Sequence, residues 1–356
     1  MEIGIVGLPN VGKSSLFNAL TSAGVASENF PFTTIEPNVG VVPVRNERLD
    51  KLEALFSSEK KVPAFVRFVD IAGLMPGASK GEGLGNKFLS HIRSVDAIAQ
   101  VVRCFDDKDV VNVLGDLDPR KDVEVISTEL LLADLEQAEK TKVKFEGPAR
   151  AGAEEGKKMF ELLDGVHKKL AQGIPVRRQG LPEGAVKDFN FLTAKPVLYV
   201  ANVNDKTDPA VVAKVKAFAD ENGAQMVQLN AKLEADVMSL PEEDRAGFRE
   251  ALGVHESGLA TLAAAGEKLL KLVTFFTVGP KEAHAWHTSE GSPVTAAAGR
   301  IHSDLERGFI RAEVYAADEI FEAGSEAALR GKGRVRMEGK DYITQDGDVI
   351  HIHFKV

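Results

Sequence analysis

The chain has 356 residues, a hydrophobic fraction of 44% and a formal net charge of −9 at pH 7. This length suggests about two or three domains, and the acidic balance argues against a protein that coats nucleic acid non-specifically. No apolar run approaches the roughly 20 residues that a membrane span needs. The single cysteine, Cys104, cannot form an internal disulfide, and no signal-peptide pattern precedes the first expected strand. We therefore expect a cytoplasmic protein without membrane contacts.

The first chemical motif follows an apolar strand that is expected at residues 3–6. Residues 7–14 read Gly-Leu-Pro-Asn-Val-Gly-Lys-Ser, which is a phosphate-loop pattern, and a helix is expected directly after it. In such a loop the backbone amides curl around a phosphate, the lysine reaches the β- and γ-phosphates, and the serine hydroxyl binds magnesium. The positive end of the following helix adds to the attraction. We predict Lys13 as the catalytic residue and nucleotide contacts from Asn10, Val11, Gly12, Lys13, Ser14 and Ser15.

Two later segments are typical of the switches of a G protein. An apolar strand expected at residues 65–69 leads into Asp70-Ile-Ala-Gly73. Asp70 can hold magnesium through a water, and the backbone N–H of Gly73 can meet the γ-phosphate. In residues 30–37, the hydroxyl of either Thr33 or Thr34 can complete the magnesium coordination. These segments favour a nucleotide-dependent switch over a metabolic kinase, in which they would have no role.

Together these motifs resemble the Obg-related G proteins, and most closely the YchF subfamily, the Obg-like ATPases. The resemblance rests on residues 7–14, 29–38, 68–74, 77–86, 101–105, 338–343 and 346–349. It implies an α/β fold: a P-loop NTPase G domain with a parallel-rich sheet, an inserted antiparallel helical hairpin and a C-terminal β-grasp domain of the TGS type. It also implies ATP hydrolysis, association with ribosomes, Thr34 as the magnesium-facing threonine and a role for Asn10 in binding an activating potassium ion.

The choice of base depends on the segment after a strand that is expected at residues 196–201. Guanine-specific G proteins carry Asn-Lys-x-Asp there, and the aspartate binds the guanine nitrogens. Residues 202–205 read Asn-Val-Asn-Asp, which by itself is a degraded guanine site, whereas the resemblance favours ATP although that family usually shows Asn-x-x-Glu. A later loop at 228–232 lies where G proteins present backbone N–H groups to the base. We predict ATP, with GTP as the alternative, and contacts from Asn202, Val203 and Asp205.

Turnover is expected to be slow. Many GTPases place a water-orienting glutamine directly after the Asp-x-x-Gly motif, and Leu74 occupies that position here. A hydrophobic side chain cannot position water, so hydrolysis awaits a partner or another group. Residues 110–114 contain Asn112 but no histidine, and we assign no general base.

A helical pattern replaces the strands between residues 122 and 170. Apolar residues recur there at steps of three and four, and Glu146-Gly147-Pro148 interrupts them, which predicts two antiparallel helices with a tip near 146–153. The periodic positions are Leu131, Leu135, Ala138 and Phe145, then Met159, Leu163, Val166 and Leu170. Lysines and acidic residues interleave on the outer face, so a solvated surface is as good an interpretation as an RNA-binding one.

Strands return after residue 272. We expect them at 273–278 and 309–315, with a helix near 294–307, and a closing hairpin of 341–344 with 349–354 through Asp346-Gly347. Mixed strands with one helix suit a β-grasp module. We expect Trp286 in the core, His351 and His353 on one face without a third metal ligand, and a small basic run. That run consists of Lys332, Arg334, Arg336 and Lys340.

The sequence therefore predicts a first part of the G domain at 1–122, a hairpin insertion at 123–190, a second part of the G domain at 191–271 and a TGS-like domain at 272–356. The predicted function is that of a monomeric, ribosome-associated, magnesium-dependent ATPase that acts as a slow conformational switch. A GTPase of the same architecture is one alternative. A ribosome- or RNA-binding module with a regulatory nucleotide site is the other.

Overall fold

The computed structural model describes residues 1–25, 38–71, 84–107, 115, 117–254 and 256–355. The chain forms two compact units, of which the first contains mainly Met1–Ala23 and Arg67–Leu259, and the second mainly Val41–Val66 and Ala260–Val356. The second unit thus takes in a segment that the sequence assigned to the G domain, and the domain boundaries at 122, 190 and 271 stay predictions. In the described part of the chain, no helix is long and apolar enough to cross a bilayer.

A six-stranded sheet in the order β2-β4-β1-β5-β6-β7 is the framework of the first unit. β1 pairs in parallel with β4 and β5, and β6 pairs in parallel with β5 and β7. Every residue of β5 and β6 is buried, as expected of parallel strands that are covered on both faces. The predicted parallel-rich sheet is confirmed. Its strands are β1 (Glu2–Val6), β2 (Val39–Pro43), β4 (Phe65–Asp70), β5 (Ala97–Arg103), β6 (Val197–Asn202) and β7 (Gln225–Leu229).

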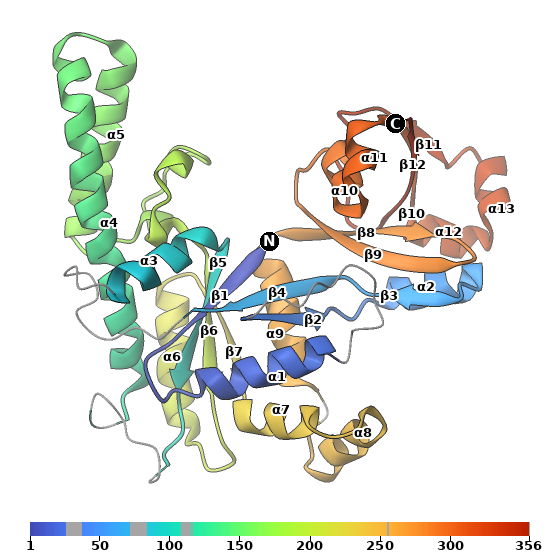
Figure 1. Cartoon of the computed structure of the whole chain (residues 1–356), viewed down its shortest axis with the longest axis horizontal. Helices are drawn as coiled ribbons and strands as arrows, with labels where there is room; N and C mark the ends of the chain where they lie inside the picture. Colours follow the sequence, from blue (N-terminus) through green and yellow to red (C-terminus); the bar gives the residue numbers. More distant parts are fainter. Residues whose placement is uncertain (26–37, 72–83, 108–114, 116, 255, 356) are drawn as a thin grey trace. The chain divides into compact units, whose positions relative to one another are not determined.

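Helices cover both faces of this sheet. α4 packs on β5 and α6 packs on β6 and β7, and Figure 1 shows α1 and α7 on the other side of the strands. In such a sheet the loops after the parallel strands meet at one edge, where ligands bind. The helices of this unit other than the hairpin are α1 (Lys13–Val25), α3 (Leu84–Ser94), α6 (Pro209–Glu221), α7 (Ala231–Met238), α8 (Glu242–Ala251) and the start of α9 (Gly258–Leu269).

The predicted helical hairpin is formed by α4 (Pro119–Arg150) and α5 (Glu154–Ala171), and it projects from the sheet in Figure 1. All eight predicted apolar positions belong to one core cluster, in which Ala138, Leu163, Val166 and Leu170 are fully buried. The predicted break at 146–148 is wrong, because α4 continues through Pro148 and the chain turns at 151–153, where Gly152 has φ +82°. Pro148 lies in the last turn of a 32-residue helix, where packing on α5 outweighs one missing hydrogen bond.

A buried carboxylate fastens the hairpin to the chain that follows it. Asp134 on α4 is 0% exposed and accepts hydrogen bonds from the backbone N–H of Leu192 (2.8 Å) and from the N–H (2.7 Å) and hydroxyl (2.6 Å) of Thr193. Burial raises the pKa of Asp134, and these hydrogen bonds oppose that rise. The connecting segment carries three 3₁₀ turns, η2 (Val176–Arg178), η3 (Lys187–Phe189) and η4 (Leu192–Ala194).

The second unit contains a mixed sheet in the order β11-β10-β12-β8-β9-β3. β12 lies between β10, to which it is antiparallel, and β8, to which it is parallel. Three of its strands, β3, β9 and β11, were not predicted from the sequence. The strands are β3 (Lys60–Val62), β8 (Leu272–Val278), β9 (Glu282–Ser289), β10 (Phe309–Ala316), β11 (Arg336–Glu338) and β12 (Asp348–Phe354).

The predicted closing hairpin is wrong. Residues 341–344 form no strand and contribute only a single bridge from Ile343 to Pro293. Asp346-Gly347 binds β8 instead: the Asp346 carboxylate accepts from the N–H of Thr274 (2.9 Å), and the Gly347 N–H donates to the Thr274 carbonyl (2.8 Å). Gly347 has φ +89°, which explains the Asp-Gly signal, but the turn leads into β12 from a loop rather than from a neighbouring strand.

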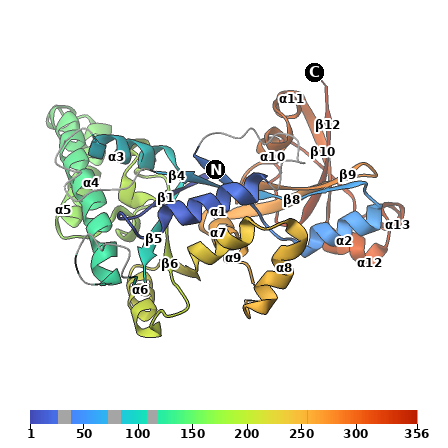
Figure 2. The ribbon, with the colours of Figure 1, turned by 60° about the horizontal axis from the view of Figure 1, so that its bottom comes forward.

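Helices cover both faces of the second sheet, as Figure 2 shows for α10 and α11 on one side and α2 and α12 on the other. The predicted single helix near 294–307 is two helices, because His302 is extended (φ −163°) and caps the second. Trp286 packs against the α10 core only half-buried, so the expectation of a core tryptophan holds in part. These helices are α2 (Glu47–Phe56), α10 (Val294–Ile301), α11 (Ser303–Arg307), α12 (Ala317–Ala323) and α13 (Glu326–Gly331).

The two histidines of β12 are neighbours on one face, as predicted. The rings of His351 and His353 lie 5.0 Å apart, and His353 contacts Glu313 at 3.0 Å. Within the described residues, no group of three His, Cys, Asp or Glu side chains could hold a metal ion.

We expect Asp134→Ala to lower the free energy of unfolding by about 3 kcal/mol, because it leaves buried N–H and hydroxyl donors without an acceptor. The measurement is urea unfolding of the purified chain, followed by circular dichroism. Glu136→Ala, an exposed site on the same helix that pairs with Lys140, is the control and should leave the midpoint unchanged. Equal midpoints for the two variants would show that the anchor contributes nothing.

Candidate functional site

The phosphate loop begins where β1 ends at Val6 and closes where α1 begins at Lys13. Asn10 and Gly12 have positive φ angles, +65° and +92°. A Cβ on Gly12 would lie 2.0 Å from the amide nitrogen of Asn202, so both the backbone angle and the space require glycine. The loop therefore curls ahead of the N-terminal end of α1, which is the geometry predicted for anion binding.

Lys13 contacts Asp70, the carboxylate at the end of β4 that the sequence predicts to act in the same site. Its ammonium group forms an ion pair with Asp70, and the two side chains are only 14% and 25% exposed. Parallel pairing of β1 with β4 sets Ile5 opposite Asp70, so the register of the two strands brings the lysine and the aspartate together. One cation and one hard oxygen donor thus lie at the same edge of the sheet.

Asn202, at the end of β6, connects the phosphate loop to the loop before α7. Its side chain is 3% exposed, donates to the carbonyl of Val11 (2.9 Å) and accepts from the N–H of Ala231 (3.0 Å). The N–H donor and the oxygen acceptor of this side-chain amide are both hydrogen-bonded. A neutral side chain of another shape would therefore lose at least one buried hydrogen bond. The predicted contact residue is thus also a structural brace.

A cavity of about 970 Å³ brings most of the predicted site residues together. Its lining includes Asn10, Gly12, Lys13, Ser14, Ser15, Asn202, Val203 and Asp205. Val11 is buried instead and contributes its carbonyl to Asn202, and Asp70 joins the site through Lys13. Thr33, Thr34, Gly73, Leu74 and Asn112 lie outside the described residues.

The same cavity has further walls, of which the sequence predicted only the loop at 228–232. Asn230 and Lys232 come from the loop that was expected to face the base, and Asn230 caps α7 by accepting from the N–H of Leu233 (3.0 Å). Phe105 carried a signal, because it follows β5 at the edge where Asn202 follows β6. Leu252 and Val254 follow α8, and no local sequence pattern indicates that they belong to the site. The further lining residues are Leu8, Pro9, Asp107, Asn204 and Asp236.

A buried arginine holds the Phe105 wall in place. Arg103 is 4% exposed, donates from Nε to the carbonyl of Phe105 (3.0 Å) and from Nη2 to that of Asp107 (3.3 Å), and its guanidinium lies 4.8 Å from the Phe105 ring.

The neighbouring Cys104 takes no part in the chemistry. Burial, with a smaller contribution from the charge of Asp122, raises the pKa of its thiol to about 12, so the thiol stays protonated.

The helices that carry the opposite wall depend on a second buried charge pair. Glu234 of α7 is 2% exposed and binds Arg249 of α8 through two hydrogen bonds of 2.9 Å. It also accepts from the N–H of Gly258 at the start of α9 (2.7 Å). Since α7 and the end of α8 both line the cavity, Glu234 is placed to position that wall.

Two family models match this chain. The model described as 50S ribosome-binding GTPase covers residues 2–135, and the model YchF-GTPase_C, described as a protein of unknown function (DUF933), covers residues 272–355. With the phosphate loop at the carboxyl edge of the parallel sheet, the chain is therefore a P-loop GTPase-fold protein with an additional C-terminal module.

Relatives at full length define the family more closely. The chain is 46% identical over 360 residues to the ribosome-binding ATPase YchF of Haemophilus ducreyi, which covers 100% of this chain and 99% of that protein. It is 47% identical to the protein of the same name from Bacillus subtilis, with 100% of both chains covered. The solved structure of the Schizosaccharomyces pombe YchF GTPase matches 99% of this chain and 97% of its own, with a TM-score of 0.88 and 34% identity. This chain belongs to the YchF family.

We expect Glu234→Ala to weaken nucleotide binding by about tenfold, because the unpaired Arg249 and Gly258 release the α7–α8 wall of the cavity. The measurement is a titration with a fluorescent ATP analogue. Glu243→Ala, on the exposed face of α8, should bind as the unmodified chain does. If Glu234→Ala stays folded and binds with full affinity, the pair does not position the wall.

Proposed function

We propose that this chain is a ribosome-binding ATPase that hydrolyses ATP to ADP and phosphate and acts as a slow conformational switch. The observation that carries the proposal is the convergence of the phosphate loop, the Lys13–Asp70 pair and Asn202 on one large cavity. The names of the full-length relatives, ribosome-binding ATPase, support the substrate and the partner. In this proposal the protein works in the cytoplasm and is a monomer.

The roles of the site residues follow from their chemistry. Lys13 clamps the β- and γ-phosphates, while the loop from Asn10 to Ser15 presents backbone N–H groups. Gly73 meets the γ-phosphate, and its release after hydrolysis is the switching event. No side chain near the cavity is assigned as a general base, so catalysis consists of positioning and charge stabilisation, which fits slow turnover.

Magnesium fits the donors of this site. The Ser14 hydroxyl and the Asp70 carboxylate are hard oxygen ligands, and Thr34 supplies another hydroxyl. Among the described residues, no group of three His, Cys, Asp or Glu side chains could hold a metal. Magnesium in nucleotide sites binds through a few protein oxygens together with the phosphates of the substrate. Magnesium when bound would neutralise charge on the phosphates. A potassium ion near Asn10 stays a prediction from the family resemblance.

Adenine is the proposed base. Val203 replaces the lysine whose stem lies along guanine, which weakens guanine discrimination. The cavity offers apolar side chains, among them Phe105, Leu233 and Leu252, for the flat faces of a purine. Asp205 is retained and exposed in the cavity wall, so GTP remains the alternative substrate.

Ribosome binding is proposed from the relatives rather than from a basic surface. Three lysines of the hairpin pair with acidic neighbours one turn away, in Lys140–Glu136, Lys158–Glu154 and Lys168–Asp164. In the second unit, Arg334 pairs with Glu319, and Arg336 lies near Glu338 and Asp348. These pairs compensate part of the positive charge on both surfaces, so neither surface by itself indicates a site for ribosomal RNA.

We expect Lys13→Ala to lower ATP turnover by at least about 100-fold, because the charge on the transferred phosphate loses its cationic partner. Steady-state phosphate release with and without ribosomes is the measurement, and ribosomes should stimulate the unmodified chain. Lys216→Ala on α6, which pairs with Asp220, is the control and should keep full turnover. Unchanged hydrolysis in Lys13→Ala would show that the site is misassigned, and a lack of ribosome stimulation would favour a binding module.

We expect ATP to bind about tenfold more tightly than GTP, because residue 203 lacks the lysine stem that supports guanine. Separate titrations with fluorescent ATP and GTP analogues, with magnesium and potassium present, test the preference. Val203→Lys should bring the two affinities closer together. Tenfold tighter GTP in the unmodified chain would make it a GTPase.

A further inference from the structure

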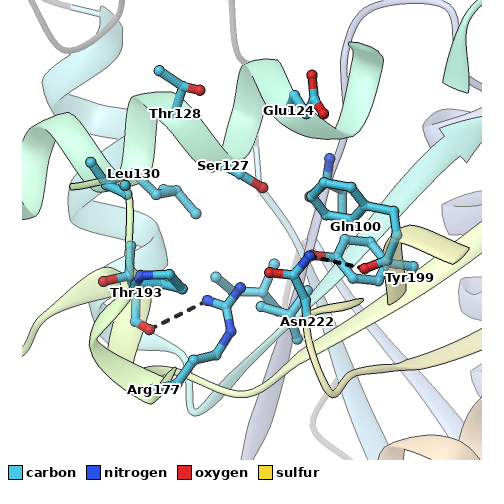
Figure 3. Close-up of a pocket in the computed structure, with 15 residues that line it drawn as sticks. Gln100, Glu124, Ser127, Thr128, Leu130, Arg177, Thr193, Tyr199 and Asn222 are labelled. Atoms are coloured by element: carbon cyan, nitrogen blue, oxygen red, sulfur yellow. Dashed lines mark hydrogen bonds between the residues drawn. The ribbon is translucent and has the colours of Figure 1, made fainter. Parts of the chain in front are cut away.

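A second cavity, of about 310 Å³, lies in the first unit away from the phosphate loop. It is bounded by β5, β6, α4, α6 and the segment after the hairpin, and Figure 3 shows its lining. It shares no lining residue with the nucleotide cavity. Ile98 and Val197, which line it, lie near the amino ends of β5 and β6, whereas Asn202 ends β6 at the phosphate loop.

The cavity is lined by an arginine whose hydrogen-bonding capacity is not filled. The Nη1 atom of Arg177 donates to the carbonyl of Thr193 (3.3 Å), while its Nε atom is buried without a hydrogen-bond partner. Within the described residues, no carboxylate lies at ion-pair distance from this guanidinium. Burial lowers the pKa of Arg177, whereas the hydroxyl of Tyr199 and, from beyond ion-pair distance, the carboxylate of Asp134 oppose that effect. A guanidinium remains charged near neutral pH. An unpaired charge in such surroundings is costly unless something binds it.

The other walls combine hydrogen-bonding groups with an apolar surface. Ser127 turns inward from α4, and Tyr199 and Asn222 bring a hydroxyl and an amide to the same space (Figure 3). Burial raises the pKa of Tyr199, so its hydroxyl is a proton donor. The apolar side is formed by Ile98, Leu130, Leu131, Pro175, Val197 and Phe218.

One acid lies on the rim. Glu124 is exposed, pairs with Arg120 at 3.1 Å and points away from Arg177 in Figure 3. Glu124 shares Arg120 with Glu221, so it interacts with a cation outside the cavity rather than with Arg177.

We propose that this cavity binds a small organic oxyanion, a carboxylate or a phosphate monoester with a short apolar body, and that Arg177 is its cationic partner. The planar fork of a guanidinium can donate two hydrogen bonds to a pair of oxygens on either group. The apolar walls select the body of the ligand. The volume of the cavity lies at the lower end of the range that ligand pockets have, which limits the ligand to a small molecule. The proposal is independent of the nucleotide site.

The test is an NMR titration of the full-length chain labelled with ¹⁵N-arginine, with ADP and magnesium saturating the nucleotide cavity. The probes are sodium butyrate, ethyl phosphate and the uncharged analogue butyramide. We expect butyrate or ethyl phosphate to shift the Nε–Hε signal of Arg177 with saturation, and butyramide to leave it in place. The tighter of the two anions identifies the head group.

Variants separate the charge from the fold. Arg177→Met keeps the length of the side chain without its charge, and it should weaken binding of the preferred anion at least tenfold by calorimetry. Arg150→Met at the exposed hairpin tip is the matched control and should bind normally. If Arg177→Met does not fold, Arg177→Lys, which keeps the charge without the planar fork, should bind more weakly than the unmodified chain. No saturable shift with either anion, or equal binding of butyramide, would overturn the proposal.

Discussion

The two hydrogen bonds of the Asn202 side chain are the constraint on which the nucleotide site depends. They join the carbonyl of Val11 to the backbone N–H of Ala231, the first residue of α7, so that the phosphate loop and the start of α7 have one common brace. The brace also limits the sequence of the loop, since the amide nitrogen occupies the space that a side chain at Gly12 would need. A buried amide with both functions paired is rigid and costly to replace.

Around this brace, the first unit positions its remaining groups with buried charge. Lys13 lies against Asp70, and Glu234 joins α7, α8 and the start of α9 through Arg249 and Gly258. Each of these charges has a partner of opposite sign or a set of N–H donors, as burial requires. Arg177 departs from this pattern, because its hydrogen-bond partners are an uncharged carbonyl and a hydroxyl, and the Asp134 carboxylate acts on it only from beyond ion-pair distance. The difference separates charges that build the fold from one that is available to a ligand.

Sequence patterns succeeded where a feature depends on nearby residues. The phosphate loop, the strand that precedes it and the apolar stripes of the hairpin were all predicted, and their positions were confirmed. They failed where distant chain segments compete. Asp346-Gly347 has the composition of a hairpin turn, yet Thr274 of β8 takes its hydrogen bonds, and β12 pairs with β10 and β8. Pro148 normally ends a helix, but the facing helix α5 keeps α4 intact to Arg150.

The sequence by itself determined the class of chemistry, because a phosphate loop needs its glycines, lysine and serine within eight consecutive residues. It also determined the hairpin, since a 3.6-residue period is a local property. Only the tertiary structure decided which side chains form the cavity walls, for Phe105, Asp236 and Leu252 come from separate segments of the chain. It alone decided that β3, β9 and β11 complete the second sheet and that the Nε atom of Arg177 is buried without a hydrogen-bond partner. Strand pairing and burial are sums over distant residues, which no local pattern records.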